Sequence, residues 1–249
     1  MGEQTTHICN NCGAVSKGYF CPECGQRLSV HKVTFKETFE DFTDAAFSVN
    51  GPLLTTLKGL LKQPGLLFHE FLGGKRKKYY KPVAFFLLTT VVYLFIHSLI
   101  GFDPLKDAII QVSDAADPDK LLSQARDFML LNIDNMLFIF VFTLAIFSKI
   151  FFYSRNTLAE FLAISFYMIG VYTLIVTLNM FFVHYWSSAI KPIEILIMGV
   201  YFIVAMTSFL NRPKFRIIIK SFVLYFMAFI SYLILSFGLS TLIIFIKLL

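Results

Sequence analysis

Apolar residues are gathered into five long stretches, which occupy residues 82–101, 136–153, 158–183, 192–210 and 221–246. Together they hold 109 residues but only three of the 38 charged side chains. Because a helix rises about 1.5 Å per residue, roughly 20 apolar residues cross a hydrocarbon core about 30 Å thick. The pattern therefore predicts a mainly α fold, a polytopic helical membrane bundle of about five transmembrane helices. Segment 221–246 is long for one straight span, and a tilt or a bend near Gly238 would absorb the excess length.

The chain from residue 33 to residue 72 is amphipathic rather than continuously apolar. Three phenylalanines share one face of its first predicted helix: Phe35, Phe39 and Phe42. Pro52 suits the first turn of a second helix, which ends at Pro64, and a short third helix follows. We expect these helices to lie in the membrane interface or to dock onto the bundle. Docking on a partner protein is the alternative.

The composition excludes several classes of protein. The chain is 57% hydrophobic and 15% charged, whereas ordinary soluble domains are about a quarter charged. A disordered chain, a simple soluble enzyme and a disulfide-rich secreted domain are therefore excluded. The first long apolar run begins at Pro82, so we expect no signal peptide.

The charges are distributed asymmetrically. If the N-terminus is cytoplasmic and five spans leave the C-terminus outside, 17 of the 22 Lys and Arg residues fall on the cytoplasmic side. The external loop 102–135 instead carries seven aspartates. Basic residues favour the cytoplasmic side of membrane proteins, so the distribution predicts an N-in/C-out orientation. It also explains most of the net charge of +6 without a nucleic-acid partner.

A basic collar lies directly ahead of the first span. Its members are Lys75, Arg76, Lys77, Lys78 and Lys81, with Tyr79 and Tyr80 among them. Lysines and arginines before a span set topology and attract anionic lipid headgroups, and tyrosines are frequent at headgroup depth. We interpret the collar as a topology signal with nonspecific attraction to anionic lipid. Specific lipid capture and nucleic-acid contact are the sharper alternatives.

All four cysteines lie within 16 positions, in the pattern C-x2-C-x8-C-x2-C formed by Cys9, Cys12, Cys21 and Cys24. Two C-x-x-C hooks can place four thiolates on one tetrahedral ion, and a glycine after each hook suits the sharp turn. The spacing predicts a zinc ribbon, with iron, disulfide or redox chemistry as alternatives. Four cysteines leave no position for water, so the zinc would be structural.

The chain divides into three predicted parts. Residues 1–30 form the cytoplasmic zinc ribbon, and residues 31–81 form the amphipathic helices with the basic collar. Residues 82–249 form the membrane domain. Its loop 102–135 contains a short helix near residues 117–129, with Asp117 as a candidate cap.

Few ionisable residues interrupt the spans. Lys149 and Glu160 flank a tight turn at similar depth, which predicts an ion pair, although Lys149 alone would snorkel to the interface. A second set lies near the outer boundary and could form a metal or proton site: His97, Asp134, His184 and Glu194. Helix ends also reach water, which is the simpler explanation. Asn179 is expected to make an interhelical hydrogen bond. No familiar catalytic motif is present.

Several segments resemble a family of functionally uncharacterised bacterial membrane proteins: CNNCG, FCPECGQ, LLTTLKGLLKQPG, GGKRKKYYKP and FSKIFFYSRNTLAEF. The resemblance implies a bacterial inner-membrane protein. It marks the four cysteines together with Thr56, Pro64, Gly74, Lys75, Arg76, Tyr79 and Pro82. Family members often carry Glu-His where this chain has Glu160 followed by Phe161, which weakens a chemical role for that histidine. A looser similarity is to the five-span Yip family, which is linked to membrane trafficking.

Three hypotheses follow for function. The first is a noncatalytic membrane adaptor, assembly or trafficking-type factor whose ribbon binds a protein partner or larger membrane complex. The second is a small transporter or channel that uses the outer polar set. The third is an intramembrane enzyme acting on lipid or peptide.

Overall fold

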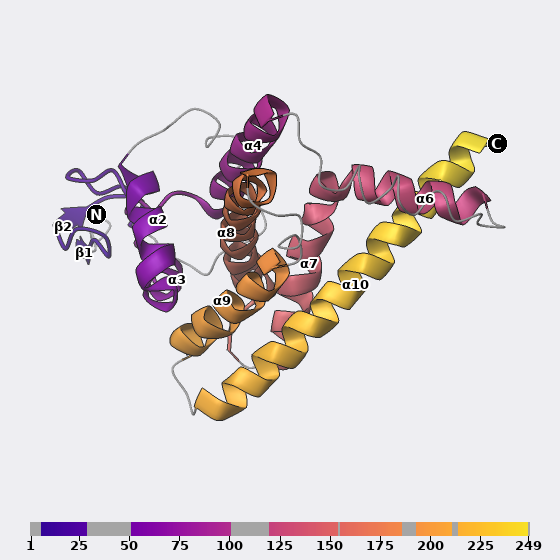
Figure 1. Ribbon diagram of the computed structural model, residues 1–249. Coiled ribbons are helices and arrows are strands. Elements are labelled where there is room, and N and C mark those ends of the chain that lie inside the picture. Colours follow the sequence, from indigo (N-terminus) through magenta and orange to yellow (C-terminus); the bar gives the residue numbers. More distant parts are fainter. Residues whose placement is uncertain are drawn as a thin grey trace.

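The computed structural model describes residues 6–28, 51–100, 120–153, 155–185, 193–210 and 214–248. The predicted mainly helical fold is confirmed, since eight helices and one small sheet make up the described part of the chain (Figure 1). Residues 29–50 lie outside it, so the predicted helix that bears Phe35 is not described.

The N-terminal head is a pair of short β hairpins. Strand β1 (Thr6–Ile8) pairs with β2 (Val15–Lys17) in antiparallel register, and Ile8 lies opposite Val15. An isolated bridge joins Phe20 to Arg27. The hairpins bring the two C-x-x-C hooks together, as the sequence predicts.

Two short helices follow the head, α2 (Pro52–Lys62) and α3 (Pro64–Leu72), each with a proline in its first turn. A fixed φ and a missing N–H suit proline to that position. Helix α3 packs against the bundle: the Phe68 ring lies edge-on to Phe209 at 5.9 Å and stacks on Tyr167 at 6.2 Å. Helix α3 therefore docks onto the bundle, which is one of the placements expected from the sequence.

Long apolar helices form the rest of the molecule. Four can cross a membrane by length and composition: α4 (Pro82–Ile100), α8 (Leu158–Tyr185), α9 (Ile193–Leu210) and α10 (Lys214–Leu248). A fifth span is possible if α6 (Lys120–Leu131) and α7 (Ile133–Phe151), which meet at 87°, count as one bent span. The described residues therefore give a membrane protein with four to five candidate spans.

Helix α8 lies at the centre of the bundle. Its candidate span is 72% buried, against 17% for that of α10, and α4, α7 and α9 all pack against it. The outward faces of α4 and α10 present many large apolar side chains. Since lipid tails are the apolar solvent of a membrane protein, these faces suit a hydrocarbon environment.

Two segments of the membrane domain can be compared with the expectations from the sequence. The short helix expected near residues 117–129 corresponds to α6, which packs along α10 (Figure 1). The Lys247 ammonium of α10 lies 5.1 Å from the centre of the Phe128 ring of α6. Helix α10 continues unbroken past Gly238 and begins at Lys214. Residues 101–119, including the candidate cap Asp117, lie outside the described chain.

Candidate metal centre and the loop ahead of the first span

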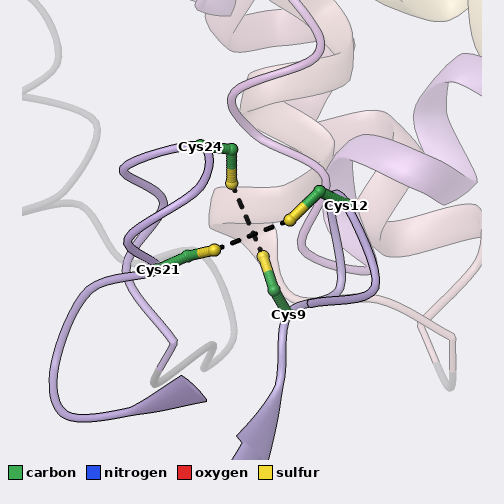
Figure 2. Close-up of side chains that lie close together, drawn as sticks. All are labelled: Cys9, Cys12, Cys21 and Cys24. Atoms are coloured by element: carbon green, nitrogen blue, oxygen red, sulfur yellow. Dashed lines mark hydrogen bonds between the residues drawn. The ribbon is translucent and has the colours of Figure 1, made fainter. Parts of the chain in front are cut away.

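The four cysteine side chains point toward a common centre (Figure 2). Their Sγ atoms all lie within 4.8 Å of one another, with 3.6 Å between Cys9 and Cys24 and 3.5 Å between Cys12 and Cys21. Thiolates about 2.3 Å from one tetrahedral ion would be separated by roughly 3.8 Å. All four are free thiols, so the disulfide alternative is not adopted. The cluster can hold a metal ion.

The backbone of each hook closes a tight turn. The amide of Gly13 donates to the carbonyl of Cys9 at 2.8 Å, and that of Gly25 donates to the carbonyl of Cys21 at 2.8 Å. Both glycines have positive φ, +78° and +66°. An L side chain rarely adopts that conformation, which explains the glycine after each hook. Two matching turns thus hold four sulfurs in place.

One hook is joined to the loop ahead of the first span, residues 73–81, which we call the pre-span loop. The backbone carbonyl of Gln26 accepts a hydrogen bond from the Cys21 amide at 2.7 Å. Its side chain donates through Nε2 to the carbonyl of Gly74 and accepts through Oε1 from the amide of Lys77 at 3.4 Å. Gln26 is only 4% exposed. The cysteine cluster and the pre-span loop therefore share a buried interface.

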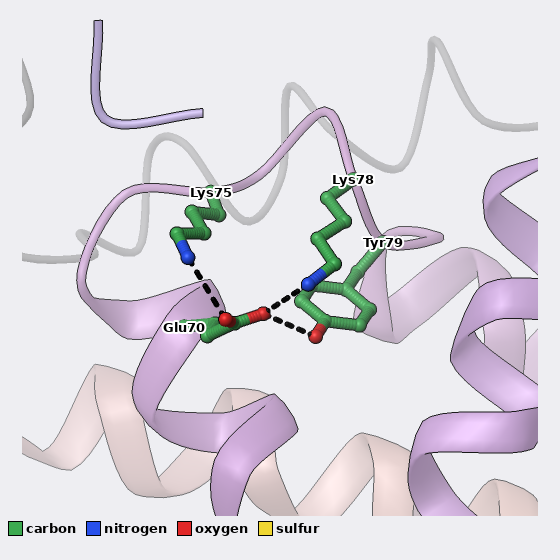
Figure 3. Close-up of polar contacts among 4 residues, drawn as sticks. All are labelled: Glu70, Lys75, Lys78 and Tyr79. Atoms are coloured by element: carbon green, nitrogen blue, oxygen red, sulfur yellow. Dashed lines mark hydrogen bonds and ion pairs between the residues drawn. The ribbon is translucent and has the colours of Figure 1, made fainter. Parts of the chain in front are cut away.

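The pre-span loop is organised around one carboxylate of α3 (Figure 3). The ammonium groups of Lys75 and Lys78 lie 2.8 Å and 2.5 Å from the oxygens of Glu70, and the Tyr79 hydroxyl donates to the same carboxylate at 2.5 Å. Bonds from Lys75, Lys78 and Tyr79 lower the pKa of Glu70 from 4.5 to about 2. Glu70 in turn raises the pKa of Lys78.

The two tyrosines of the basic collar pack against the protein itself. Tyr79 and Tyr80 are both buried, and burial is the largest cause of the raised pKa of Tyr79. The Tyr80 amide donates to the Thr56 hydroxyl of α2 at 2.7 Å, and its carbonyl accepts from the Tyr167 hydroxyl of α8. The tyrosines therefore anchor the loop to α2, α3 and α8, while Lys77 stays exposed.

Sequence reasoning missed Glu70 and Gln26. Glu70 had one available signal, because it is the single acidic residue in segment 51–81 beside seven lysines and arginines. Nothing in the sequence marks Gln26, since its role depends on a contact with residues about 50 positions away.

The expected ion pair between Lys149 and Glu160 is corrected. The Lys149 ammonium instead donates to the backbone carbonyls of Tyr153 and Asn156, at 2.7 Å and 2.8 Å. The Glu160 carboxylate accepts from the amide of Thr157 at 2.8 Å and from the side chain of Asn156 at 3.1 Å. Because an acid at the third helical position satisfies the free amide ahead of it, Glu160 caps α8. Lys149 and Glu160 therefore both bond to residues of the turn between α7 and α8, and not to one another.

The outer polar set is described only at His97 and Glu194. Glu194 accepts a hydrogen bond from Asn179 at 2.5 Å, which confirms the expected interhelical bond of Asn179. The side chains of Asp134 and His184 lie outside the described residues. Within those described, the cysteines form the one cluster of three or more potential metal ligands, and His97 and Glu194 are not part of it.

A family model described as "Protein of unknown function (DUF3667)" matches residues 51–94. The matched segment contains α2, α3, the pre-span loop and the first part of α4. The chain is thus similar to this family around Glu70, in agreement with the sequence resemblance to an uncharacterised family. No curated protein and no solved structure matches the chain. Nothing in these comparisons supports the looser similarity to the Yip family.

Proposed function

We propose that this chain is a noncatalytic membrane adaptor or assembly factor, of the trafficking type or similar, whose head recruits a protein partner. The observation that carries the proposal is the exposure of large apolar side chains on the head. Four of them are between 64% and 79% exposed: Ile8, Val15, Tyr19 and Phe20. We call these four residues the ribbon patch.

Exposed apolar surface of this kind is costly on so small a unit. The described head has only 23 residues, and its own core is limited to Cys9, Cys21 and Leu28 with Ala14 and Cys24 against them. Ile8 and Val15 are cross-strand neighbours, so their side chains share one face of the hairpin. Large exposed apolar groups commonly mark sites of association, and tyrosine is enriched in such contacts.

We further propose that the ion held by the four cysteines is Zn²⁺ in a structural role. Four thiolates fill a tetrahedral coordination sphere, so the ion would hold the two hooks together and would not activate water. A head with so few core residues depends on such an ion for folding. Elemental analysis of the purified chain should find one zinc per chain, and none after Cys21→Ser with Cys24→Ser. Iron in its place would contradict this assignment.

The proposal places the head in the cytoplasm, at the inner membrane of a bacterium, near anionic lipid headgroups. The support is the charge distribution, with 17 of 22 basic residues on the side of the N-terminus. An N-terminal reporter that fluoresces only in the cytoplasm should be bright, and a dark reporter on a well-expressed chain would reverse the orientation.

Site-specific photocrosslinking tests the partner. A photoreactive amino acid at position 20, within the ribbon patch, should give a discrete protein adduct in cells. The matched control is position 61, because Leu61 is similarly exposed but lies on α2. The adduct should disappear with Cys21→Ser and Cys24→Ser. Adducts to lipid alone, or equal protein adducts from both positions, would contradict the proposal.

A further inference from the structure

We propose that the metal-loaded head acts as a clamp on the pre-span loop, so that metal occupancy sets the order of the basic segment that precedes the first span. This inference rests on the proposed metal site but not on the proposed partner. It assigns Gln26 the role of the residue that joins the two parts.

Gln26 is positioned by the metal turn itself. It directly follows Gly25, and its carbonyl accepts from the amide of the metal ligand Cys21 at 2.7 Å. Because the head lacks a core large enough to fold it, the geometry of this turn depends on the ion that joins the four sulfurs. Loss of the ion therefore releases the backbone that carries Gln26.

The side chain of Gln26 then joins the head to the pre-span loop. Its side-chain amide donates one hydrogen bond to the carbonyl of Gly74 and accepts one from the amide of Lys77. A buried amide that loses such partners is costly, which favours the docked arrangement. Asn10, from the other hook, adds an exposed contact, also of 3.4 Å, to the carbonyl of Gly73. Each hook thus contributes one amide side chain to the loop.

The far end of the loop is fixed without the head. The Tyr80 amide donates to Thr56 of α2, and the Tyr80 carbonyl accepts from Tyr167 of α8. These contacts lie within the helical part of the molecule. Lys75 and Lys78 are likewise held by Glu70 of α3. Removal of the metal should therefore release the Lys77 amide from Gln26 and leave Tyr80 in place.

The difference between Lys77 and Tyr80 has a consequence at the membrane surface. Lys77 is exposed and lies five positions before the start of α4, which keeps it within about 18 Å of that helix even in a fully extended chain. When the clamp holds, the exposed lysine is presented in one geometry. When the clamp opens, the same charge is mobile near the headgroups, and its electrostatic attraction to them is no longer directional.

Residue-resolved hydrogen exchange of the full chain in lipid nanodiscs tests the clamp. Stripping the metal with a strong zinc chelator should speed exchange of the Lys77 amide about tenfold, the effect expected when two net hydrogen bonds are lost. The Tyr80 amide should change little and serves as the internal reference. Gln26→Ala should speed Lys77 exchange to the same extent while elemental analysis still finds the metal. Glu23→Gln, at an exposed position of the same hook, should behave as the unaltered chain.

Two results would overturn the inference. One is a metal-free head, seen as fast exchange over residues 6–28, together with unchanged protection of the Lys77 amide. The other is unchanged Lys77 protection in Gln26→Ala. Loss of the photocrosslinked adduct plays no part in either result, so failure of the clamp and failure of the proposed partner are separate outcomes.

Discussion

Glu70 of α3 is the residue on which the side chains of the pre-span loop converge. Its carboxylate forms ion pairs with Lys75 and Lys78 and accepts a hydrogen bond from the Tyr79 hydroxyl. From the sequence alone, Lys75 and Lys78 would be expected to attract lipid headgroups. In the structure their ammonium groups instead hold the loop against α3. The electrostatics of this segment are consequently less positive at the surface than a count of lysines suggests, and Lys77 remains exposed.

The lowered pKa of Glu70 predicts a specific pH dependence. Because its folded pKa is about 2, against 4.5 without these partners, its contribution is fully present above pH 4.5 and is lost as the pH falls toward 2. Glu70→Gln should lower stability at pH 7 by on the order of 2 kcal/mol. The difference in Tm from the unaltered chain should shrink steadily below pH 4.5. A constant difference from pH 7 to pH 3 would show that the contacts do not depend on the charge.

Sequence reasoning worked well for residues whose chemistry is local. The four cysteines and their following glycines need only short spacing to be recognised, and the structure brings the sulfurs within 4.8 Å. It was wrong about the Lys149–Glu160 pair, and it did not predict the bonds of Tyr79 and Tyr80 to the helices. In those cases the backbone of a turn, or a helix distant in sequence, supplied a partner that no residue pattern displays.

The short helix α3 is held against α9 by a close approach of the two backbones. A Cβ atom added at Gly65 would lie 2.4 Å from the backbone carbon of Ser208 and 2.6 Å from the amide nitrogen of Phe209. Backbone cannot move aside as a side chain can, so glycine is required for this contact. The docking of α3 in turn positions Glu70 for the pre-span loop.

Gly65→Ala should therefore destabilise the docked helix by about 1–3 kcal/mol through overpacking. The matched control is Gly51→Ala, because Gly51 has helical φ and ψ and no atom within 4 Å of an added Cβ. Thermal unfolding in detergent should show a lower Tm for Gly65→Ala alone. Equal Tm values for the two variants would show that α3 does not pack as closely as described.

The ends of the helices show how far a hydrophobic pattern predicts where a helix begins and ends. The stretches at 82–101 and 192–210 correspond closely to α4 and α9. Helix α10 begins at Lys214 rather than at residue 221, because its backbone continues through charged residues that an apolar criterion excludes. Helix α6 lies close to the short helix expected near residues 117–129, but its packing on α10 was not visible in its own residues.

The described part of the molecule consists of a head with the four-cysteine cluster, a docked pair of short helices and a bundle centred on α8 (Figure 1). The sequence predicted these parts and their order, but not that the head would bind the loop ahead of the first span. That contact joins residues 26 and 74, which are 48 positions apart. That contact joins the head, which bears the ribbon patch, to the helical part of the molecule.

Native mass spectrometry of the chain purified in mild detergent tests the adaptor function most directly. The unaltered chain should retain one metal ion and a stoichiometric protein partner. Tyr19→Ala with Phe20→Ala should keep the metal and lose the partner, whereas Leu61→Ala should keep both. A metal-loaded chain that is monodisperse and free of any partner when taken directly from its membrane into native nanodiscs would contradict the proposed function.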